Sequence, residues 1–343
     1  MITIGRENIE NLITTIHAHM VSWTEKHRPT RLRDVSGNDQ VIRALQSFTS
    51  MDATPNMILH GPPGSGKTSS IISMAKSFFG KTNISTMTLE LNAGDSRSVG
   101  TMRDQIHFFT RCSSVTDRST NALKLVILDE ADALTSCAQR ALRHLIETTS
   151  GRARFCLCCN YISRLSSGLR SRCTSFSFSG IGNVQLAHAL REVARKERLE
   201  ISQEGLNVVV KVCAGDARQG INLLQSLSLG DATTLAVRDD QAVYATCGLP
   251  SPSQTSEIFD VLLNQSFSVG YTTLTSFVDL CQFSLLQMIP PLVESIISCS
   301  DEKMSVDRVG KVLSTLADVE RCLSNGGSEG VAMGAMVGAF HLQ

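Results

Sequence analysis

The strongest constraint on the fold is a glycine-rich loop that lies between an apolar run and a helical pattern. Residues 61–68 read Gly-Pro-Pro-Gly-Ser-Gly-Lys-Thr, which satisfies the phosphate-loop pattern G-x-x-x-x-G-K-[ST]. The apolar residues 57–59 suit a buried strand, and residues 69–76 place apolar side chains at helical spacing. A strand, a glycine loop and a helix in this order point backbone N–H groups and the positive helix end at a polyphosphate. The segment therefore predicts a nucleoside triphosphate site, since a chance glycine-rich surface turn would not be expected to have both a strand before it and a helix after it.

A second motif supplies groups suited to hydrolysis. Residues 124–132 read Lys-Leu-Val-Ile-Leu-Asp-Glu-Ala-Asp, an apolar strand that ends in adjacent carboxylates. At the carboxyl edge of a parallel sheet, Asp129 can hold the shell of a Mg²⁺ ion, and Glu130 can orient and deprotonate an attacking water. The alternative is that both carboxylates only cap the helix that begins near Thr135. The preceding strand and the phosphate loop favour the metal and water roles.

The net charge of zero hides a division along the chain. Up to Leu199 there are 25 Lys and Arg against 16 Asp and Glu, and from Glu200 onward there are 7 against 16. The basic excess is concentrated in residues 140–198, which favours polyphosphate partners beyond the nucleotide, including nucleic acid. For residues 191–198, where Glu192 and Glu197 interleave with the cations, a solvated helix face is the preferred interpretation.

Cysteine usage and hydropathy restrict the class of protein. The eleven cysteines are scattered, and the cluster Cys156, Cys158 and Cys159 lies in a strand-like run that sends Cys158 and Cys159 to opposite faces. Paired C-x-x-C knuckles are missing, so we expect reduced buried thiols and not a zinc site. The chain shows neither the pattern of a secretory signal nor an apolar run of membrane-spanning length, so we expect it to be neither secreted nor membrane-inserted.

Strand and helix patterns alternate from about residue 57 to 178, which predicts a parallel α/β sheet covered by helices. The expected strands are 57–60, 87–92, 125–129, 155–160 and 174–178, and the expected helices are 67–79, 99–111, 138–148 and 166–169. Strand signals then fade, and a small bundle is expected from helices 184–196, 204–213 and 217–227. A polar, turn-rich stretch at 248–256 is expected to precede further helices at 258–263, 272–283, 285–298, 305–324 and 331–340.

Six motifs occur in a characteristic order. They are Trp-Thr-Glu-Lys-His-Arg-Pro (23–29), Leu-Glu-Leu-Asn-Ala-Gly-Asp-Ser-Arg (89–97), Asp-Glu-Ala-Asp followed by Ala-Gln-Arg-Ala-Leu-Arg (129–143), Arg-Phe-Cys-Leu-Cys-Cys-Asn (154–160), Ser-Arg-Cys (171–173) and Gly-Asp-Ala-Arg-Gln (215–219). With these motifs the chain resembles the AAA+ clamp loaders, and within them the small subunits of eukaryotic replication factor C. The resemblance is strong over residues 23–226 and weaker beyond them, where it rests on helical character and length.

The resemblance implies a domain plan and a subunit type. It implies a variable extension at residues 1–20, an AAA+ ATP-binding α/β domain at 21–180, a helical lid domain at 181–247 and a helical collar domain for oligomerisation at 248–343. Within the small subunits, residues 103–107 and 216–225 look most like the type called subunit 2 in vertebrates and subunit 4 in yeast.

The matched motifs also imply a set of nucleotide contacts. The resemblance assigns ATP binding to Thr24, Ser36, Gly61, Pro62, Pro63, Gly64, Ser65, Gly66, Lys67, Thr68, Ser69, Asn160 and Arg218. It implies Mg²⁺ ligation by Thr68 and Asp129, and catalysis by Lys67 and Glu130.

Further residues are expected to act on the γ-phosphate. Asn160 would hydrogen-bond it or the attacking water, and Arg218 would reach it from the lid. Ordinary capping or surface charge is the alternative for both. Arg172 is expected to enter the neighbouring subunit's site in trans as an arginine finger, which contributes roughly 10³–10⁵ in rate in related NTPases.

DNA contact is expected from Arg103, Arg140 and Arg143, through phosphates and not bases. Some positions depart from the family's pattern: they are His27, Gly94, Ser96, Ser98, Gln105, His107 and Ser175. Gln105, His107 and Ser175 stand where the family carries cations that face duplex DNA. Because phosphate affinity scales with the number of charges neutralised, we expect a weaker DNA contact from this subunit.

The predicted function is that of an ATPase subunit in a nuclear, heteropentameric replication factor C. ATP binding would open the sliding clamp (PCNA) around primer–template DNA, and hydrolysis would release it closed, in replication and repair. One alternative is a scaffold subunit that binds ATP without turnover and donates Arg172, which the intact Glu130 disfavours. Another is an AAA+ branch-migration motor, which would not require the Ser-Arg-Cys motif. The order of subunits in the ring and a replication or checkpoint role stay open.

Overall fold

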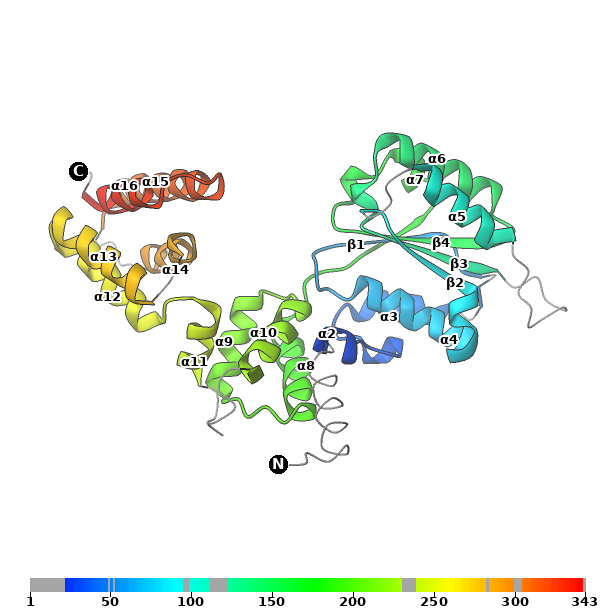
Figure 1. Ribbon diagram of the computed structural model, residues 1–343, viewed down its shortest axis with the longest axis horizontal. Helices are drawn as coiled ribbons and strands as arrows, with labels where there is room; N and C mark the ends of the chain where they lie inside the picture. Colours follow the sequence, from blue (N-terminus) through cyan, green and yellow to red (C-terminus); the bar gives the residue numbers. More distant parts are fainter. Residues whose placement is uncertain are drawn as a thin grey trace, which may run out of the picture. The chain divides into compact units, whose positions relative to one another are not determined.

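The computed structural model describes residues 22–48, 50–51, 53–94, 99–111, 123–229, 239–281, 284–298 and 304–341 (Figure 1). It divides into two compact units, one of Met1–Leu199 with Val209–Gln225 and the other of Glu200–Val208 with Ser226–Gln343. The expected extension at 1–20 lies outside the described residues. The domain boundaries expected near residues 180 and 247 stay predictions.

A parallel sheet forms the centre of the first unit. Its described strands are β1 (Met57–His60), β2 (Thr88–Asn92), β3 (Lys124–Asp129), β4 (Ala153–Cys159) and β5 (Thr174–Ser177), in the order β2-β3-β4-β1-β5. Every neighbouring pair is parallel, as β1 with β4 and β3 with β4. The predicted parallel α/β sheet is confirmed. Because all strands run the same way, the phosphate loop, Asp129 and Asn160 follow strand ends at one edge.

Helices cover both faces of this sheet (Figure 1). On one face lie α3 (Asp39–Ser47) and α4 (Lys67–Met87), and on the other lie α5 (Val99–Arg111), α6 (Ser136–Thr148) and α7 (Ser167–Arg170). Short helical turns complete the connections: they are α2 (Trp23–Lys26), η1 (Leu32–Asp34), η2 (Ala131–Ala133) and η3 (Ile162–Arg164). The two faces carry separate apolar cores, and a fully buried leucine or isoleucine in them contributes about 1.5–3 kcal/mol.

Strand β4 contributes to both cores by alternation. Cys156 and Cys158 belong to the core under α4, whereas Phe155 and Cys159 belong to the core under α6. The expected opposite placement of Cys158 and Cys159 is therefore confirmed. Burial raises the pKa of Cys159 to about 12, so this thiol stays protonated at neutral pH.

The helix that follows the phosphate loop is longer than its pattern predicted. It was expected to end at residue 79, but α4 continues to Met87 across a break at Gly80 (φ 71°, ψ 175°). Glycine adopts that backbone conformation without a Cβ clash, so the chain changes direction there and resumes helical geometry. Helix α3 was not predicted.

The predicted helices after the sheet are confirmed as α8 (Asn183–Lys196), α9 (Gln203–Cys213) and α10 (Ala217–Leu229). In the first unit, α8 and α10 approach closely at Gly220, where a Cβ would lie 2.9 Å from a methyl carbon of Leu190. None of the described helices combines the length and apolarity needed to cross a bilayer.

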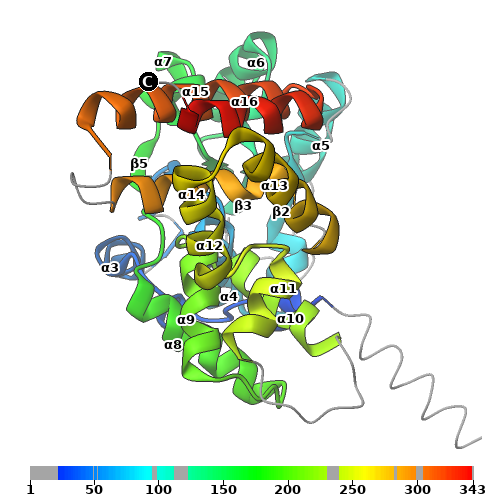
Figure 2. The same ribbon diagram turned by 90° about the vertical axis from the view of Figure 1, so that its left-hand side faces the viewer.

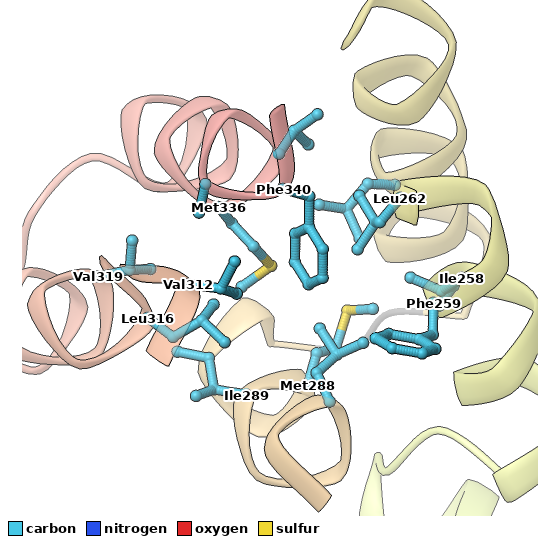
Figure 3. Packing of buried hydrophobic residues seen from close by; sticks show 14 of the residues in the cluster. Ile258, Phe259, Leu262, Met288, Ile289, Val312, Leu316, Val319, Met336 and Phe340 are labelled. Carbon is cyan, nitrogen blue, oxygen red and sulfur yellow. The ribbon is translucent and has the colours of Figure 1, made fainter. Parts of the chain in front are cut away.

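From residue 239 onward, the described part of the second unit contains helices and no strands. They are α11 (Asp240–Cys247), α12 (Pro252–Asn264), α13 (Phe267–Cys281), α14 (Leu285–Ile297), α15 (Val306–Ser324) and α16 (Glu329–His341). Helices α15 and α16 pack side by side (Figure 2). Residues from α12, α14, α15 and α16 meet in one core, in which Met288, Leu316 and Phe340 are buried (Figure 3).

Two predicted boundaries in this unit are wrong. The stretch 248–256 was expected to be turn-rich, but α12 begins at Pro252, because Ser251 and Gln254 form a reciprocal capping box. Helix α13 begins at Phe267 instead of residue 272. The first turns of α12 and α13 contain several Ser, Thr or Gly residues, which hide the helical spacing of the apolar residues in the sequence.

Truncation of Phe340 tests the core of the second unit. Its side chain is fully buried and packs edge to face on Phe259 at 6.1 Å between ring centroids. Phe340→Ala should lower the free energy of unfolding by about 3–5 kcal/mol. Hydrogen exchange of the amides in α12–α16 measures the loss, and the control Val331→Ala, on the same helix but 71% exposed, should change protection by less than about 0.5 kcal/mol.

Candidate nucleotide-binding site

The phosphate loop has the backbone geometry that anion binding requires. Gly64 (φ 63°) and Gly66 (φ 93°) are left-handed, and Gly66 is the N-cap residue of α4. The first N–H groups of a helix lack partners within it, so the first turn of α4 presents donors and a positive dipole end to the loop. At Gly64 a Cβ would lie 1.7 Å from Oδ1 of Asp216, which brings the loop into direct contact with the start of α10.

Lys67 is the charged centre of the loop. Its side chain is buried, and Nζ donates to the carbonyl oxygens of Gly61 (2.8 Å) and Pro62 (2.7 Å) and to Oδ1 of Asn160 (3.2 Å). Burial lowers the pKa of Lys67 from its ordinary value, and nearby Asp129 partly opposes this shift. The ammonium is held by neutral oxygens that a phosphate can replace with stronger, charge-assisted hydrogen bonds.

A pair of oxygens suited to Mg²⁺ lies beside Lys67. The Thr68 hydroxyl donates to Oδ2 of Asp129 at 2.9 Å. Hydroxyl and carboxylate oxygens at the start of a helix and the end of a strand are the donor set that Mg²⁺ takes beside a phosphate. Residues Thr68 and Asp129 therefore fit the predicted metal position.

Glu130 stands next to this pair in an unusual backbone conformation. Its φ is 54°, and its N–H donates to Oδ1 of Asp129 at 3.0 Å. The carboxylate is exposed and approaches Gly94, where a Cβ would lie 2.9 Å from Oε2. A non-glycine residue in the left-handed region costs free energy, and such residues cluster at functional sites.

Asn160 is fixed by a residue that the sequence interpretation left without a role. Oδ2 of Asp132 accepts from the backbone N–H groups of Asn160 and Tyr161, each at 3.3 Å. The side-chain amide of Asn160 is thereby directed to Lys67. The position of Asp132 at the end of the Asp-Glu-Ala-Asp motif is the sequence signal that could have indicated this role.

Asn38 is a second organiser that the sequence did not reveal. It has a left-handed backbone (φ 56°), and its side chain accepts from the N–H of Ser179 (2.8 Å) and donates to the carbonyl oxygens of Ser179 (3.1 Å) and Ser65 (3.4 Å). It thus connects the phosphate loop to the chain between β5 and α8. Asparagine is the residue type, besides glycine, that visits this backbone region most easily.

The N-terminus of α10 meets the phosphate loop directly. Oδ1 of Asp216 accepts from the N–H groups of Arg218 (2.8 Å) and Gln219 (3.1 Å), and the N–H of Ala217 donates to the carbonyl oxygen of Gly64 (3.4 Å). Arg218 is held at this end of the helix. Arg218 lines the cavity, and its role toward the γ-phosphate stays a prediction.

A cavity of about 1050 Å³ joins these elements within the first unit. The predicted residues that line it are Thr24, Ser36, Pro63, Gly64, Gly66, Lys67, Thr68, Ser69, Asp129, Glu130, Asn160 and Arg218. Gly61, Pro62 and Ser65 belong to the loop but do not line the cavity, and two of them supply the carbonyls that hold Lys67. Its volume is of the size that small-molecule sites have.

Arg172 lies outside this cavity. Its Nε forms an ion pair with Glu147 at 2.6 Å, and Nη1 donates to the carbonyl oxygen of Gly168 at 2.9 Å. To act on a nucleotide bound by its own chain, Arg172 would have to line this cavity. Its position outside the cavity is compatible with the predicted role in trans.

The predicted DNA contacts lie on helices that cover one face of the sheet. Arg103 is exposed on α5 beside Asp104 (3.7 Å), and Arg140 and Arg143 are exposed on α6. Gln105 on α5 and Ser175 on β5 are exposed too. Ser96 and Ser98 lie outside the described residues.

The fold and the cavity define a nucleotide-binding ATPase of the AAA class. Residues 57–181 match the family described as "ATPase family associated with various cellular activities (AAA)", and residues 250–339 match "Replication factor C C-terminal domain". Human "Replication factor C subunit 5" is 35% identical over 93% of this chain and 91% of its own length, and Saccharomyces cerevisiae "Replication factor C subunit 3" is 34% identical over 93% and 92%. The chain belongs to the replication factor C subunit family.

The structural likeness reaches outside this family. The "Thermotoga maritima RuvB Holliday junction branch migration motor" superposes with a TM-score of 0.52 over 78% of this chain and 91% of that chain, at 17% identity. At that identity the likeness shows the AAA+ fold alone.

The predicted subunit type is wrong. Relatives that match more than nine-tenths of the chain include subunit 5 in human and mouse and subunit 3 in yeast, which point to a different subunit from the predicted type 2 or 4. The windows used for the prediction, 103–107 and 216–225, are short. The second contains Asp216 and Arg218, which serve the contact with the phosphate loop.

Gly64→Ala tests the packing of the loop on α10. The substituted alanine would have to keep the left-handed backbone conformation of Gly64, which costs about 1–2 kcal/mol, and its Cβ would displace the side chain of Asp216. ATP affinity measured by calorimetric titration should fall by about tenfold or more. The control Gly151→Ala meets no heavy atom within 4 Å and should bind ATP like the wild type; equal affinities for all three proteins would contradict the geometry.

Proposed function

We propose that this chain is an ATP-hydrolysing subunit of a replication factor C clamp loader. The observation that carries the proposal is the convergence of Lys67, the pair Thr68 and Asp129, Glu130, Asn160 and Arg218 on one cavity. Membership of the replication factor C subunit family supports the rest of the proposal.

The residues divide the chemistry of phosphoryl transfer between them. The phosphate loop and Lys67 would bind the β- and γ-phosphates, because the buried Lys67 lines the cavity and the first N–H groups of α4 have no partner within the helix. A Mg²⁺ ion held by Thr68 and Asp129 would neutralise charge between those phosphates. Glu130 takes the proton of the attacking water, and Asn160 orients the water or the γ-phosphate.

The site is proposed to be completed by a neighbour. Positive charge on the transferring phosphoryl would come from the arginine finger of an adjacent subunit, as Arg172 of this chain would serve the next site. ATP between subunits would order the ring around the sliding clamp (PCNA) and primer–template DNA in the nucleus, and hydrolysis would release the clamp. The heteropentameric assembly and these partners are part of the proposal.

A scaffold subunit that binds ATP without turnover is the second candidate. Its support is the position of Arg172 outside this chain's own cavity, where it pairs with Glu147 and suits a finger donated to a neighbouring subunit. The exposed Glu130 beside Asp129 favours the hydrolytic subunit, because a scaffold has no need of a base at that place.

Lys67 and Glu130 should separate binding from turnover. Lys67→Ala removes the cation that the phosphates meet and should weaken ATP binding about 10- to 100-fold, since hydrogen bonds to charged groups contribute about 1.5–3 kcal/mol. Glu130→Gln should leave ATP binding unchanged and lower turnover by the assembled complex about 10²- to 10⁴-fold. Calorimetry and phosphate release measure the two effects; loss of binding in both variants would refute these roles.

Arg172→Ala should act on the neighbour and not on its own chain. ATP affinity of the isolated variant should be unchanged, and turnover at the adjacent site should fall by roughly 10³–10⁵. The measurement uses complexes in which every ATP site except the adjacent one is disabled, so that the observed turnover comes from that site alone. Arg170→Ala is the matched control, because Arg170 is an exposed arginine at the end of α7, two residues before Arg172. Normal turnover at the neighbour would remove the finger role.

The proposed DNA contacts should show as salt dependence. Replacing Arg103, Arg140 and Arg143 by Ala in the assembled complex should lower affinity for primer–template DNA equally across sequences, and flatten the log–log salt slope by about 0.9 per lost phosphate contact. Fluorescence anisotropy at several salt concentrations measures both. The control replaces Arg43, which is exposed on α3, together with Arg195 and Arg321, whose ion pairs lie elsewhere; none of the three lines the ATP cavity. An equal loss in the control would mean that net charge alone acts.

A further inference from the structure

The cavity extends past the phosphate loop to a wall made by the N-terminal segment. Residues 24–30 line it, together with side chains from α8 that include Gln185 and His188. The phosphate loop takes the polyphosphate end of a nucleotide, so the remaining space next to residues 24–30 is available to the nucleoside end. The position of this segment therefore sets the shape of the nucleoside half of the site.

Glu197 holds this segment by its charge. It caps the C-terminus of α8, and its carboxylate accepts from Lys26 Nζ (2.7 Å from Oε1 and 2.9 Å from Oε2) and from His27 Nε2. The side chains of His27 and Glu197 are 10% and 11% exposed. Glu197 does not line the cavity, whereas Lys26 and His27 do. An action of Glu197 on the nucleotide must therefore pass through these two residues.

Two neutral hydrogen bonds hold the ends of the same segment. The N–H of Trp23 donates to Oε1 of Gln225 (3.0 Å), and the hydroxyl of Ser73 on α4 donates to the carbonyl oxygen of Pro29 (2.9 Å). Between these ends the ion pairs fix the middle of the segment. Without Glu197 the imidazole of His27 would be buried without its carboxylate partner, which costs more than the loss of an exposed pair.

The ionisation of Glu197 agrees with this role. Burial alone would raise its pKa, but the hydrogen bonds from Lys26 and His27 outweigh burial and hold the pKa of Glu197 below its ordinary value. The group is a carboxylate at neutral pH.

We propose that Glu197 is a positioning residue for the nucleoside end of the site: by holding Lys26 and His27 it fixes the wall of residues 24–30 against which the nucleoside binds. The inference rests on the proposed function, since it assumes that the phosphate loop binds ATP. It predicts that Glu197 affects ligands that carry a nucleoside and not ligands that carry phosphates alone.

The test compares Mg·ATP with magnesium tripolyphosphate, which can engage the phosphate loop but has no nucleoside. In the full-length chain, Glu197→Ala should weaken ATP binding by about 10- to 100-fold, because the wall must then be ordered by the ligand. Tripolyphosphate affinity should change less than about twofold. Glu197→Gln, which keeps an acceptor but no charge, should give an intermediate loss for ATP.

Matched variants separate this role from a loss of folding. Arg195→Ala breaks an exposed ion pair on the same helix and should leave both affinities unchanged. If Glu197→Ala does not fold, Glu197→Gln, which keeps the size of the side chain and lies outside the cavity, carries the test and should show a selective loss of ATP binding. Unchanged ATP affinity, or an equal loss for both ligands, would overturn the inference.

A further variant distinguishes failure of the inference from failure of the proposed function. Lys67→Ala should weaken both ligands, because both need the phosphate loop. If Lys67→Ala leaves both affinities intact, the proposed site itself is wrong, and the inference falls with it. If it weakens both while Glu197→Ala weakens neither, the site stands and only the role of Glu197 is refuted.

Discussion

A buried ammonium group organises the nucleotide-binding edge of the sheet. Lys67 Nζ is hydrogen-bonded to two carbonyl oxygens of its own loop and to Asn160, so it joins the end of β4 to the loop after β1. Burial of a cation is unfavourable unless oxygens surround it, and the carbonyls of Gly61 and Pro62 supply two of these oxygens. The arrangement favours any anion that can replace these neutral oxygens, which is the physical basis of phosphate binding here.

The phosphate loop also contacts the segments that precede two helices of the first unit. Gly64 touches Asp216 at the start of α10, and Asn38 links Ser65 to Ser179 ahead of α8. A phosphate that moves the loop must therefore move the ends of both helices or strain these contacts. Nucleotide-dependent rotation of a helical element is a common form of switching, and these contacts are the places where it would start.

The sequence predicted the strands and the phosphate-loop residues, because both depend on local patterns of a few residues. It did not reveal Asn38, Asp132 or Glu197, whose roles come from contacts with distant segments and leave no periodic signal. The start of α12 was misjudged because Ser, Pro and Gln read as a turn until the reciprocal cap is seen. The subunit type was misassigned because the prediction rested on two short windows, 103–107 and 216–225, whereas the matches to subunit 5 and subunit 3 relatives extend over 93% of the chain.

The central claim is that the cavity of the first unit is the ATP site. Photolabelling of the full-length chain with 2-azido-ATP and Mg²⁺, followed by peptide mapping, tests it directly, because the azido group reacts with whatever lies against the base. The account predicts saturable labelling of residues 24–30 or of α8, both of which line the cavity, and competition by unlabelled ATP. Saturable, competed labelling confined to residues 239–341 would contradict it.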